Sequence, residues 1–435
     1  MKRANHSKWN KVKRNWQLYV MLLLPILQVL LFAYYPMLGL QIAFKDFKVT
    51  QGVWGSPWVG LKHFQRLFQS SQFYSIFWNT LILSFYNLAI SFPFAILLAI
   101  SMNYLRSHKF KKVMQMVTYA PHFFSTAVMV GLLMQILSFR TGIVNNVLVG
   151  LGLERINFMG KASYFRSIFV WSGIWQNAGY SSIIYISALA GVDTQLHEAA
   201  MLDGASKWKR VLHIDLPCIA PTIVIQFILS IGSILNVGYQ KVLLMQNATN
   251  KQVSEVIDTF VYNSGIAAGL PNYSYTTAVG MFKSDLPDPD RAGQPDFQED
   301  QRYKLTVRED GKMRREKKIS ALSDKIFDIV NVVFAVTFFI IVLYPCIYVV
   351  SASFSSPEAL ISGQVWLFPV KFSLDGYKAV FAEKKVWMGY ANSIFYTVAG
   401  TAINVFLTAI AAYPLSRKDL VGRKGITAFF TFTMI

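Results

Sequence analysis

The residues best suited to chemistry stand beside one charged segment, EAAMLDGASKWKRVLHIDLP (Glu198–Pro217), which lies between two long apolar runs. His197 precedes Glu198, and a His-Glu pair on a helix binds and activates zinc when a second His follows three positions after the Glu. Met201 occupies that position. The spacing therefore indicates no zinc-protease site in this segment.

Other catalytic patterns are also incomplete. The Gly160-Lys161 pair is typical of the end of a phosphate-binding loop, but Ala162 follows it and no Gly stands five positions earlier. The six histidines are scattered along the chain. Two cysteines, Cys218 and Cys346, form neither a disulfide framework nor a metal cluster. We expect no catalytic residue, no metal site and no cofactor bound by this chain.

The charged segment itself predicts a helical hairpin. Glu198–Leu202 favours a helix and places its Glu near the positive end of the helix dipole. Gly204 can adopt the left-handed conformation that ends a helix, and Ser206–Leu212 can form a second short helix. Leu216 and Pro217 then turn the chain back into the next apolar run, since proline is tolerated in a first helical turn. Such a projection suits the docking of a soluble partner.

The composition assigns the chain to a membrane. Of 435 residues, 54% are hydrophobic and only 15% are charged, whereas a soluble domain carries about a quarter charged residues. The apolar runs are about twenty residues long, which is enough to cross a hydrocarbon core. The predicted fold class is all-α, a polytopic bundle of transmembrane helices. We predict spans at 17–37, 77–104, 113–137, 165–192, 218–236, 326–350 and 391–414, and the start of another from 425 to the last residue.

The net charge of +19 reflects membrane topology, and we expect no nucleic-acid partner. Basic residues gather before the first span and in the short gap 105–112, as the positive-inside rule requires of cytoplasmic segments. Leu18–Met37 is long enough to be a retained anchor, and no small-residue cleavage site follows it. We therefore predict a multi-pass protein of a bacterial plasma membrane, with the N-terminus and the segment 193–217 in the cytoplasm.

An internal repeat divides the chain into two related halves. Aromatic residues and an Asn-hydroxyl pair recur at a constant separation of 313 positions. The matched residues are Phe64 with Tyr377, Phe68 with Phe381, and Asn79-Thr80 with Asn392-Ser393. Between the halves, residues 284–320 are rich in Pro, Asp and Lys and cannot bury a core, which predicts a disordered linker. We expect a first unit at 1–283 with about five spans and the hairpin, the linker, and a truncated second unit at 321–435 with two spans and the start of a third. A sixth span begins near 273 and is cut short at Lys283.

The hairpin carries a spaced motif: Glu-Ala-Ala, a Gly after three further residues, and Ile-x-Leu-Pro after nine more. Its residues are Glu198, Ala199, Ala200, Asp203, Gly204, Ile214, Leu216 and Pro217. This pattern resembles the EAA motif of binding-protein-dependent ABC importer permeases. In that family the motif docks in a groove of a cytoplasmic ATPase and couples ATP hydrolysis to alternating access. The resemblance implies the same docking role here, with ATP hydrolysed by a partner subunit.

Other segments are similar to oligosaccharide importers of the multiple-sugar and polygalacturonan kind. "YYPML", "GLKHFQRLF" before "NTL", and "APHFFSTAVMVGLL" extend the resemblance to one permease subunit over about residues 10–282. "YPCIYVVSASFS" and "FSLDGYKAVF" make residues 313–435 similar to the N-terminal part of its partner permease. The resemblance implies four partners: a cytoplasmic ABC ATPase dimer, a second permease subunit, an extracytoplasmic solute-binding protein and membrane lipid.

Aromatic and amide side chains in the fourth predicted span are candidates for a translocation path. They are Trp175, Gln176, Asn177 and Tyr180, and positions 176 and 180 share a helical face. Sugars bind to aromatic faces and amide groups, but the same residue types also support helix packing in membranes. Packing is favoured over substrate contact, and both roles stay open.

The sequence therefore predicts a permease subunit of an ATP-driven, binding-protein-dependent importer, with oligosaccharides as the expected solutes, and it predicts no enzyme. The alternative is a membrane scaffold or receptor that docks a cytoplasmic regulator through the hairpin without moving solute. A membrane-embedded enzyme ranks last because no constellation of catalytic residues occurs.

Overall fold

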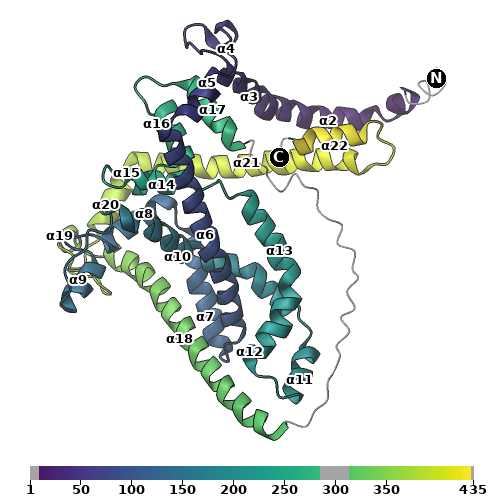
Figure 1. The fold of residues 1–435 in the computed structure, drawn as a ribbon. Coiled ribbons are helices and arrows are strands. Elements are labelled where there is room, and N and C mark those ends of the chain that lie inside the picture. The colour runs from purple at the N-terminus through teal and green to yellow at the C-terminus, as the bar shows by residue number, and fades with distance from the viewer. Residues whose placement is uncertain (1–8, 285–312, 433–435) are drawn as a thin grey trace. The chain divides into compact units, whose positions relative to one another are not determined.

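The computed structural model describes residues 9–284 and 313–432, and every element named within these ranges is a helix (Figure 1). The helices form two compact units. Unit 1 contains Met1–Gln69, Ala267–Phe282 and Asp375–Ile435, and unit 2 contains Ser70–Ile266 and Lys283–Leu374. Most of the predicted linker, residues 285–312, lies outside the described residues, and helix α18 begins within the predicted linker range, at Met313.

Unit 1 is held together by its first long helix and the last part of the described chain. Its helices are α2 (Trp16–Val29), a π-helical turn (Leu30–Tyr34), α3 (Tyr35–Met37), a 3₁₀ helix (Leu38–Phe44), α4 (Gly52–Gly55), α5 (Lys62–Gln69), most of α17 (Tyr273–Ser284), α20 (Asp375–Ala382), α21 (Lys384–Ser416) and α22 (Arg423–Phe432). The hydroxyl of Tyr19 donates a 3.0 Å hydrogen bond to the carbonyl of Val421. The rings of Tyr34 and Phe429 stack at 4.7 Å. The first predicted span therefore packs against helices of the second half of the chain.

Unit 2 is a bundle around α6 and α10, with the long helix α18 packed against it. Its helices are α6 (Ser71–Asn103), α7 (His108–Tyr119), a 3₁₀ turn (Ala120–Phe123), α8 (Thr126–Ile136), α9 (Ile143–Gly150), α10 (Ala162–Ala190), α11 (Thr194–Leu202), α12 (Lys207–Arg210), a π-helical turn (Val211–Asp215), α13 (Leu216–Gly232), α14 (Tyr239–Met245), α15 (Lys251–Ser254), α16 (Ile257–Gly265), α18 (Met313–Ser353) and α19 (Pro357–Ile361). Buried residues of α18, such as Ala335 and Phe338, join the same apolar cluster as Met114 and Val170.

Five described helices are long and apolar enough to cross a membrane, and they correspond to five predicted spans. They are Trp16–Phe44, Ser71–Asn103, Lys207–Gly232, Leu322–Ser353 and Lys384–Ser416. Helix α10 confirms the prediction of a helix at 165–192. It is 29 residues long, but it is less apolar than the five helices named above. Helix α17 has only 12 residues, so the sixth predicted span is short, as expected.

The predicted span 113–137 is not a single straight helix in the structure. Residues His108–Phe123 and Thr126–Ile136 form two helical segments bent by 105°. Pro121 lies in the 3₁₀ turn at the break, and Phe124 and Ser125 are extended. Proline lacks a backbone N–H and therefore weakens the helix there. The hydroxyl of Ser125 accepts a hydrogen bond from the backbone N–H of Val128 and so starts a new helix.

The predicted internal repeat appears in the helix lengths. Helices α5 and α20 both have 8 residues, and α6 and α21 both have 33 residues. The bounds of each pair are separated by the same 313 positions that relate the aromatic and Asn residues of the two halves. In each half of the chain, the segment before these helices contains an isolated antiparallel bridge. The bridge joins Lys45 to Trp58 in the first half and Ser355 to Phe372 in the second half.

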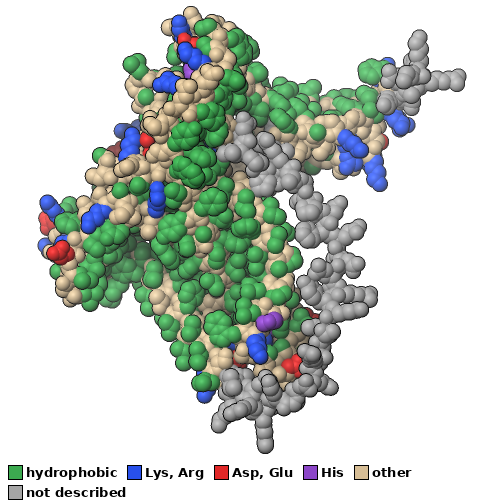
Figure 2. Space-filling model, viewed as in Figure 1, with side chains coloured by type: hydrophobic (Ala, Val, Ile, Leu, Met, Phe, Trp, Pro, Cys, Tyr) green, Lys and Arg blue, Asp and Glu red, His purple; other side chains and the backbone are tan. Residues whose placement is uncertain are grey.

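Apolar side chains cover the long helices on their outer faces. Figure 2 shows hydrophobic side chains over much of the visible face, with Lys and Arg in small groups. Leu23, Ile329 and Ile394 are each more than 60% exposed. Because exposed apolar surface on this scale is unfavourable in water, it indicates contact with lipid.

Candidate functional site: the hairpin and a membrane cavity

The first limb of the hairpin is helix α11, and it ends as the sequence predicts. Gly204 has a φ of +78°, in the left-handed region. The backbone N–H of Ala205 donates to the carbonyl of Ala200 at 2.8 Å, and that of Gly204 donates to the carbonyl of Met201 at 3.2 Å. These two bonds form a Schellman motif, which requires a residue with positive φ at the position of Gly204. The predicted helix end is confirmed.

The second limb differs from the prediction. Helix α12 continues without a break through the π-helical turn Val211–Asp215 into α13, giving one helix from Lys207 to Gly232. The expectation of a separate short helix and a turn at Leu216 and Pro217 is therefore wrong. Pro217 has no N–H to donate, and the wider π-helical bonding just before it accommodates that gap. The hairpin is thus the projecting end of a membrane helix.

A buried carboxylate joins the two limbs of the hairpin to the bundle. Asp215 is fully buried, and its Oδ2 accepts a 2.6 Å hydrogen bond from the hydroxyl of Tyr104. The ring Nε2 of His197, on α11, lies 3.2 Å from Oδ1 of Asp215. Burial raises the pKa of Tyr104 above its usual range, and the bond to Asp215 adds to the effect. Tyr104 therefore stays protonated and keeps donating to the carboxylate.

The motif residues divide by exposure. The exposed ones are Glu198, Ala199, Asp203 and Pro217, and the half-buried ones are Ala200, Gly204, Ile214 and Leu216. The tip of the hairpin is apolar, because Leu202 is 83% exposed and Met201 is 52% exposed. The sequence placed Leu202 on the surface of the hairpin but did not single out Met201. Their position just before Gly204, which ends helix α11, is the sequence signal that indicates exposure at the tip.

The four candidate path residues do not share one site. Tyr180 lines a cavity of about 710 Å³, whereas Trp175 lines a separate pocket of about 440 Å³ beside α8 and α18. The side-chain amide of Gln176 donates to the carbonyl of Phe124 at 3.0 Å. The side-chain oxygen of Asn177 lies 3.0 Å from Nδ1 of His122. Gln176 and Asn177 thus bond to the break between α7 and α8.

The larger cavity lies between α6, α10 and α13 and is lined by many polar side chains. Those on α6 are Ser84, Asn87 and Ser91, and those on α13 are Gln226 and Ser230. Within each set the spacing is three or four positions, so each set lies on one helical face. The same spacing is visible in the sequence, although the predicted path residues did not include these side chains. Polar residues that face a cavity inside a membrane bundle are candidates for solute contact.

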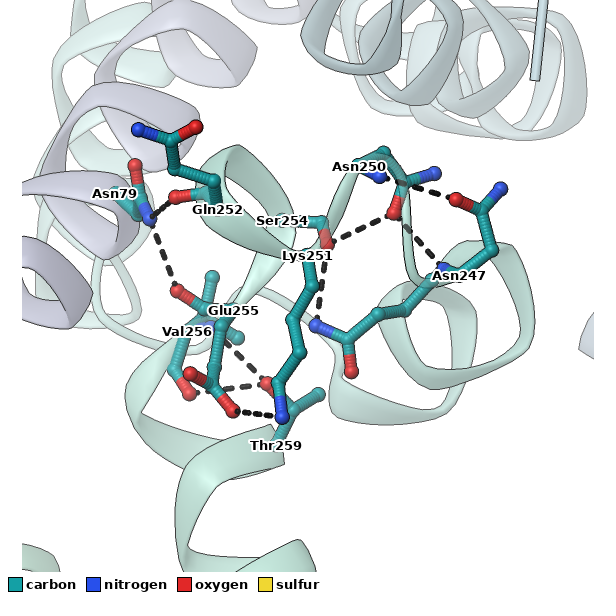
Figure 3. A network of polar contacts seen from close by, with 10 residues as sticks. Asn79, Asn247, Asn250, Lys251, Gln252, Ser254, Glu255, Val256 and Thr259 are labelled. Carbon is teal, nitrogen blue, oxygen red and sulfur yellow. Dashed lines mark hydrogen bonds and ion pairs between the residues drawn. The ribbon is translucent and has the colours of Figure 1, made fainter. Parts of the chain in front are cut away.

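The N-terminal part of α6 joins a polar network with the loop around α15 (Figure 3). The amide of Asn79 donates to the carbonyls of Gln252 at 2.8 Å and Glu255 at 3.3 Å. Arg166 donates to the side-chain oxygen of Asn79 at 2.9 Å. Thr80 accepts the first backbone N–H of α16 at 3.0 Å. The Asn-Thr pair of the repeat therefore anchors the loop around α15 to the start of a span.

Long apolar helices around a cavity with polar side chains in its lining are typical of membrane transport proteins, and comparison with known proteins agrees. The profile of the family described as binding-protein-dependent transport system inner membrane component matches residues 77–281. The polygalacturonan/rhamnogalacturonan transport system permease protein YteP of Bacillus subtilis (strain 168) is 45% identical over 267 residues, which are 61% of this chain and 83% of YteP. The permease protein YtcP of the same transport system and strain is 37% identical over 114 residues, which are 26% of this chain and 40% of YtcP.

A solved structure has the same fold over most of its length. It is the crystal structure of a bacterial ABC transporter involved in the import of the acidic polysaccharide alginate. One of its chains is 40% identical, with a TM-score of 0.58, over 63% of this chain and 92% of that chain. Our chain belongs to the family of binding-protein-dependent transport system inner membrane components. It is a multi-pass membrane permease subunit and not an enzyme, which confirms the resemblance found in the sequence.

Proposed function

We propose that this chain is the permease subunit of an ATP-driven importer of oligosaccharides and that it docks its ATPase through the hairpin. The observation that carries the proposal is the continuous helix Lys207–Gly232. One end of this helix is the second limb of the hairpin, and Gln226 and Ser230 near its other end line the cavity. The rise of 1.5 Å per residue puts Gln226 and Ser230 about 29–35 Å from Lys207. A push on the hairpin therefore reaches the cavity wall through one rigid element.

The cavity chemistry supports a sugar as solute. Asn87, Gln226 and several serines offer hydrogen-bond donors and acceptors, and Tyr180 offers an aromatic face. These groups match the hydroxyls and apolar faces of a saccharide. The names of YteP and of the alginate transporter also describe proteins that move saccharides. A cavity with polar side chains in its lining and membership in a transport family favour a permease over a scaffold that moves no solute.

The proposed partners are a cytoplasmic ABC ATPase dimer, a second permease subunit and an extracytoplasmic solute-binding protein. The ATPase supplies ATP hydrolysis, so this chain needs no cofactor of its own. The positive-inside rule supports a cytoplasmic N-terminus and hairpin. The 114-residue match to YtcP has about the length of the predicted second unit, 321–435, and supports the proposal that this unit corresponds to part of a partner permease.

The test uses the exposed hairpin tip. We expect Leu202→Asp to reduce co-purification of the co-expressed ATPase, and uptake of labelled oligosaccharide, at least about tenfold, because a charge replaces an apolar docking contact. Leu270→Asp is the matched control, since Leu270 is 95% exposed and lies outside the hairpin. Both variants should insert in membranes equally. Normal ATPase association in Leu202→Asp would contradict docking at the hairpin.

A further inference from the structure

The first part of α18 lies against the hairpin and the end of α6. Four residues on one face of α18 make this contact, and they are Asp324, Phe327, Asp328 and Asn331. They stand at positions i, i+3, i+4 and i+7, which share one face of a helix. We call this face the clasp. In Figure 1 the lower end of α18 and α12 occupy the same end of the bundle.

The clasp meets the hairpin through charge. Asp328 forms ion pairs with Lys207, at the start of α12, and with Arg106, just after α6. The side chains of Lys207 and Asp328 are only 16% and 18% exposed. Asp324 accepts a 2.6 Å hydrogen bond from the backbone N–H of Lys207. A carboxylate at this position satisfies a free N–H and complements the positive end of the helix dipole.

An aromatic contact and an amide bond extend the clasp. The ring of Phe327 lies 4.9 Å from the ring of Trp208 on the hairpin and 5.1 Å from the ring of Tyr104. Asn331 donates a 3.1 Å hydrogen bond to the carbonyl of Ser101. Phe327 is buried in the same apolar cluster as Val211 in the hairpin helix. The clasp therefore packs against the second limb of the hairpin. That limb continues into α13, which lines the cavity.

We propose that the clasp couples the hairpin to the second half of the chain, so that movement imposed on the hairpin also moves α18. Helix α18 is the first span of that half, and it packs along α6 and α7 inside unit 2. Lys207 is thus a positioning residue that works through Asp328, with which its amine pairs. This inference rests on the proposed docking function only for the origin of the movement.

The contact itself is tested without any partner protein. In the full chain with Cys218→Ser and Cys346→Ser, we expect the pair Lys207→Cys and Asp324→Cys to form a disulfide under mild oxidation, because the side chain of Asp324 reaches the backbone N–H of Lys207 itself. Lys209→Cys with Lys325→Cys is the matched control, because both lysines are exposed on the same two helices, and it should not cross-link. Cross-linking is read by mass spectrometry of peptides. Absence of the 207–324 product, or equal yield from the control pair, overturns the clasp.

The coupling is tested by charge reversal in the assembled transporter. We expect Asp328→Lys to keep ATPase co-purification but to lower stimulation of ATP hydrolysis by solute-binding protein and sugar about tenfold, because Lys207 and Arg106 then face a like charge. Adding Lys207→Asp should restore at least part of the stimulation. Lys325→Asp should have no effect. Unchanged stimulation in Asp328→Lys, or no rescue in the double variant, overturns the coupling.

Two further readouts keep the test clear. Asp328→Asn removes the charge with little change in shape and replaces Asp328→Lys if that variant elutes as aggregate.

The two proposals fail in different ways. If the hairpin does not dock the ATPase, Leu202→Asp retains the ATPase while the 207–324 disulfide still forms. If the clasp is wrong, docking survives and the disulfide does not form.

Discussion

One glycine determines the shape of the hairpin at the scale of single residues. Gly204 has a φ of +78°, and nothing lies within 4 Å of the place where a β-carbon would stand. A β-branched residue at this position would lower the free energy of unfolding by about 1–3 kcal/mol through backbone strain alone. Steric overlap makes no contribution. Substitution at Gly204 therefore reports on the bend between the two limbs.

We expect Gly204→Val to release the bend and to abolish association with the ATPase, while membrane insertion stays normal. Gly204→Asn is the matched control, because Asn tolerates the left-handed conformation, and it should keep the ATPase bound. Co-purification from detergent extracts measures both. Equal binding by the two variants would show that docking does not depend on this bend.

At the scale of helices, the crossing of α7 and α10 depends on the absence of a side chain. A β-carbon on Gly179 would lie 2.2 Å from the backbone oxygen of Thr118. The main chain of α7 cannot move aside locally, so the two helices would have to separate. This crossing packs α10, which lines the cavity, against α7, which ends at the break before α8.

We therefore expect Gly179→Ala to destabilise the protein by about 1–3 kcal/mol or more, the usual cost of overpacking. Gly131→Ala is the matched control, because Gly131 lies inside helix α8 with nothing within 4 Å of its added β-carbon. That variant should be neutral or more stable by up to about 1 kcal/mol. Thermal unfolding in detergent compares them. A wild-type melting temperature for Gly179→Ala would refute the close crossing.

At the scale of the whole molecule, the two halves of the chain exchange their first spans. Helix α2 of the first half packs with α21 in unit 1, and α18 of the second half packs with α6 and α7 in unit 2. The compact units are therefore spatial groupings that draw on both halves. The division of the chain into 1–283, 284–320 and 321–435 stays a prediction.

Orientation in the membrane is testable at this scale. In a background with Cys218→Ser and Cys346→Ser, we expect Ala248→Cys to react with an impermeant maleimide added to intact cells. His108→Cys should react only after the cells are permeabilised, because its segment is basic and faces the cytoplasm. Both positions are exposed in the structure. The reverse labelling pattern would invert the predicted topology.

The sequence alone determined the class of fold, most of the spans, the repeat and the helix-ending role of Gly204. Apolar length, charge bias and the special conformation of glycine are local properties, and they depend little on what lies elsewhere in the chain. The EAA-like spacing also depends only on the order of residues.

Tertiary structure decided the rest, because it depends on contacts between residues far apart in the sequence. The break near Pro121 and the continuous helix through Pro217 show that one residue type can either end or continue a helix, according to the bonds its surroundings supply. The cavity needed three helices to bring their polar faces together. The pairing of Asp328 with Lys207 spans 121 positions and depends on packing that no local pattern specifies.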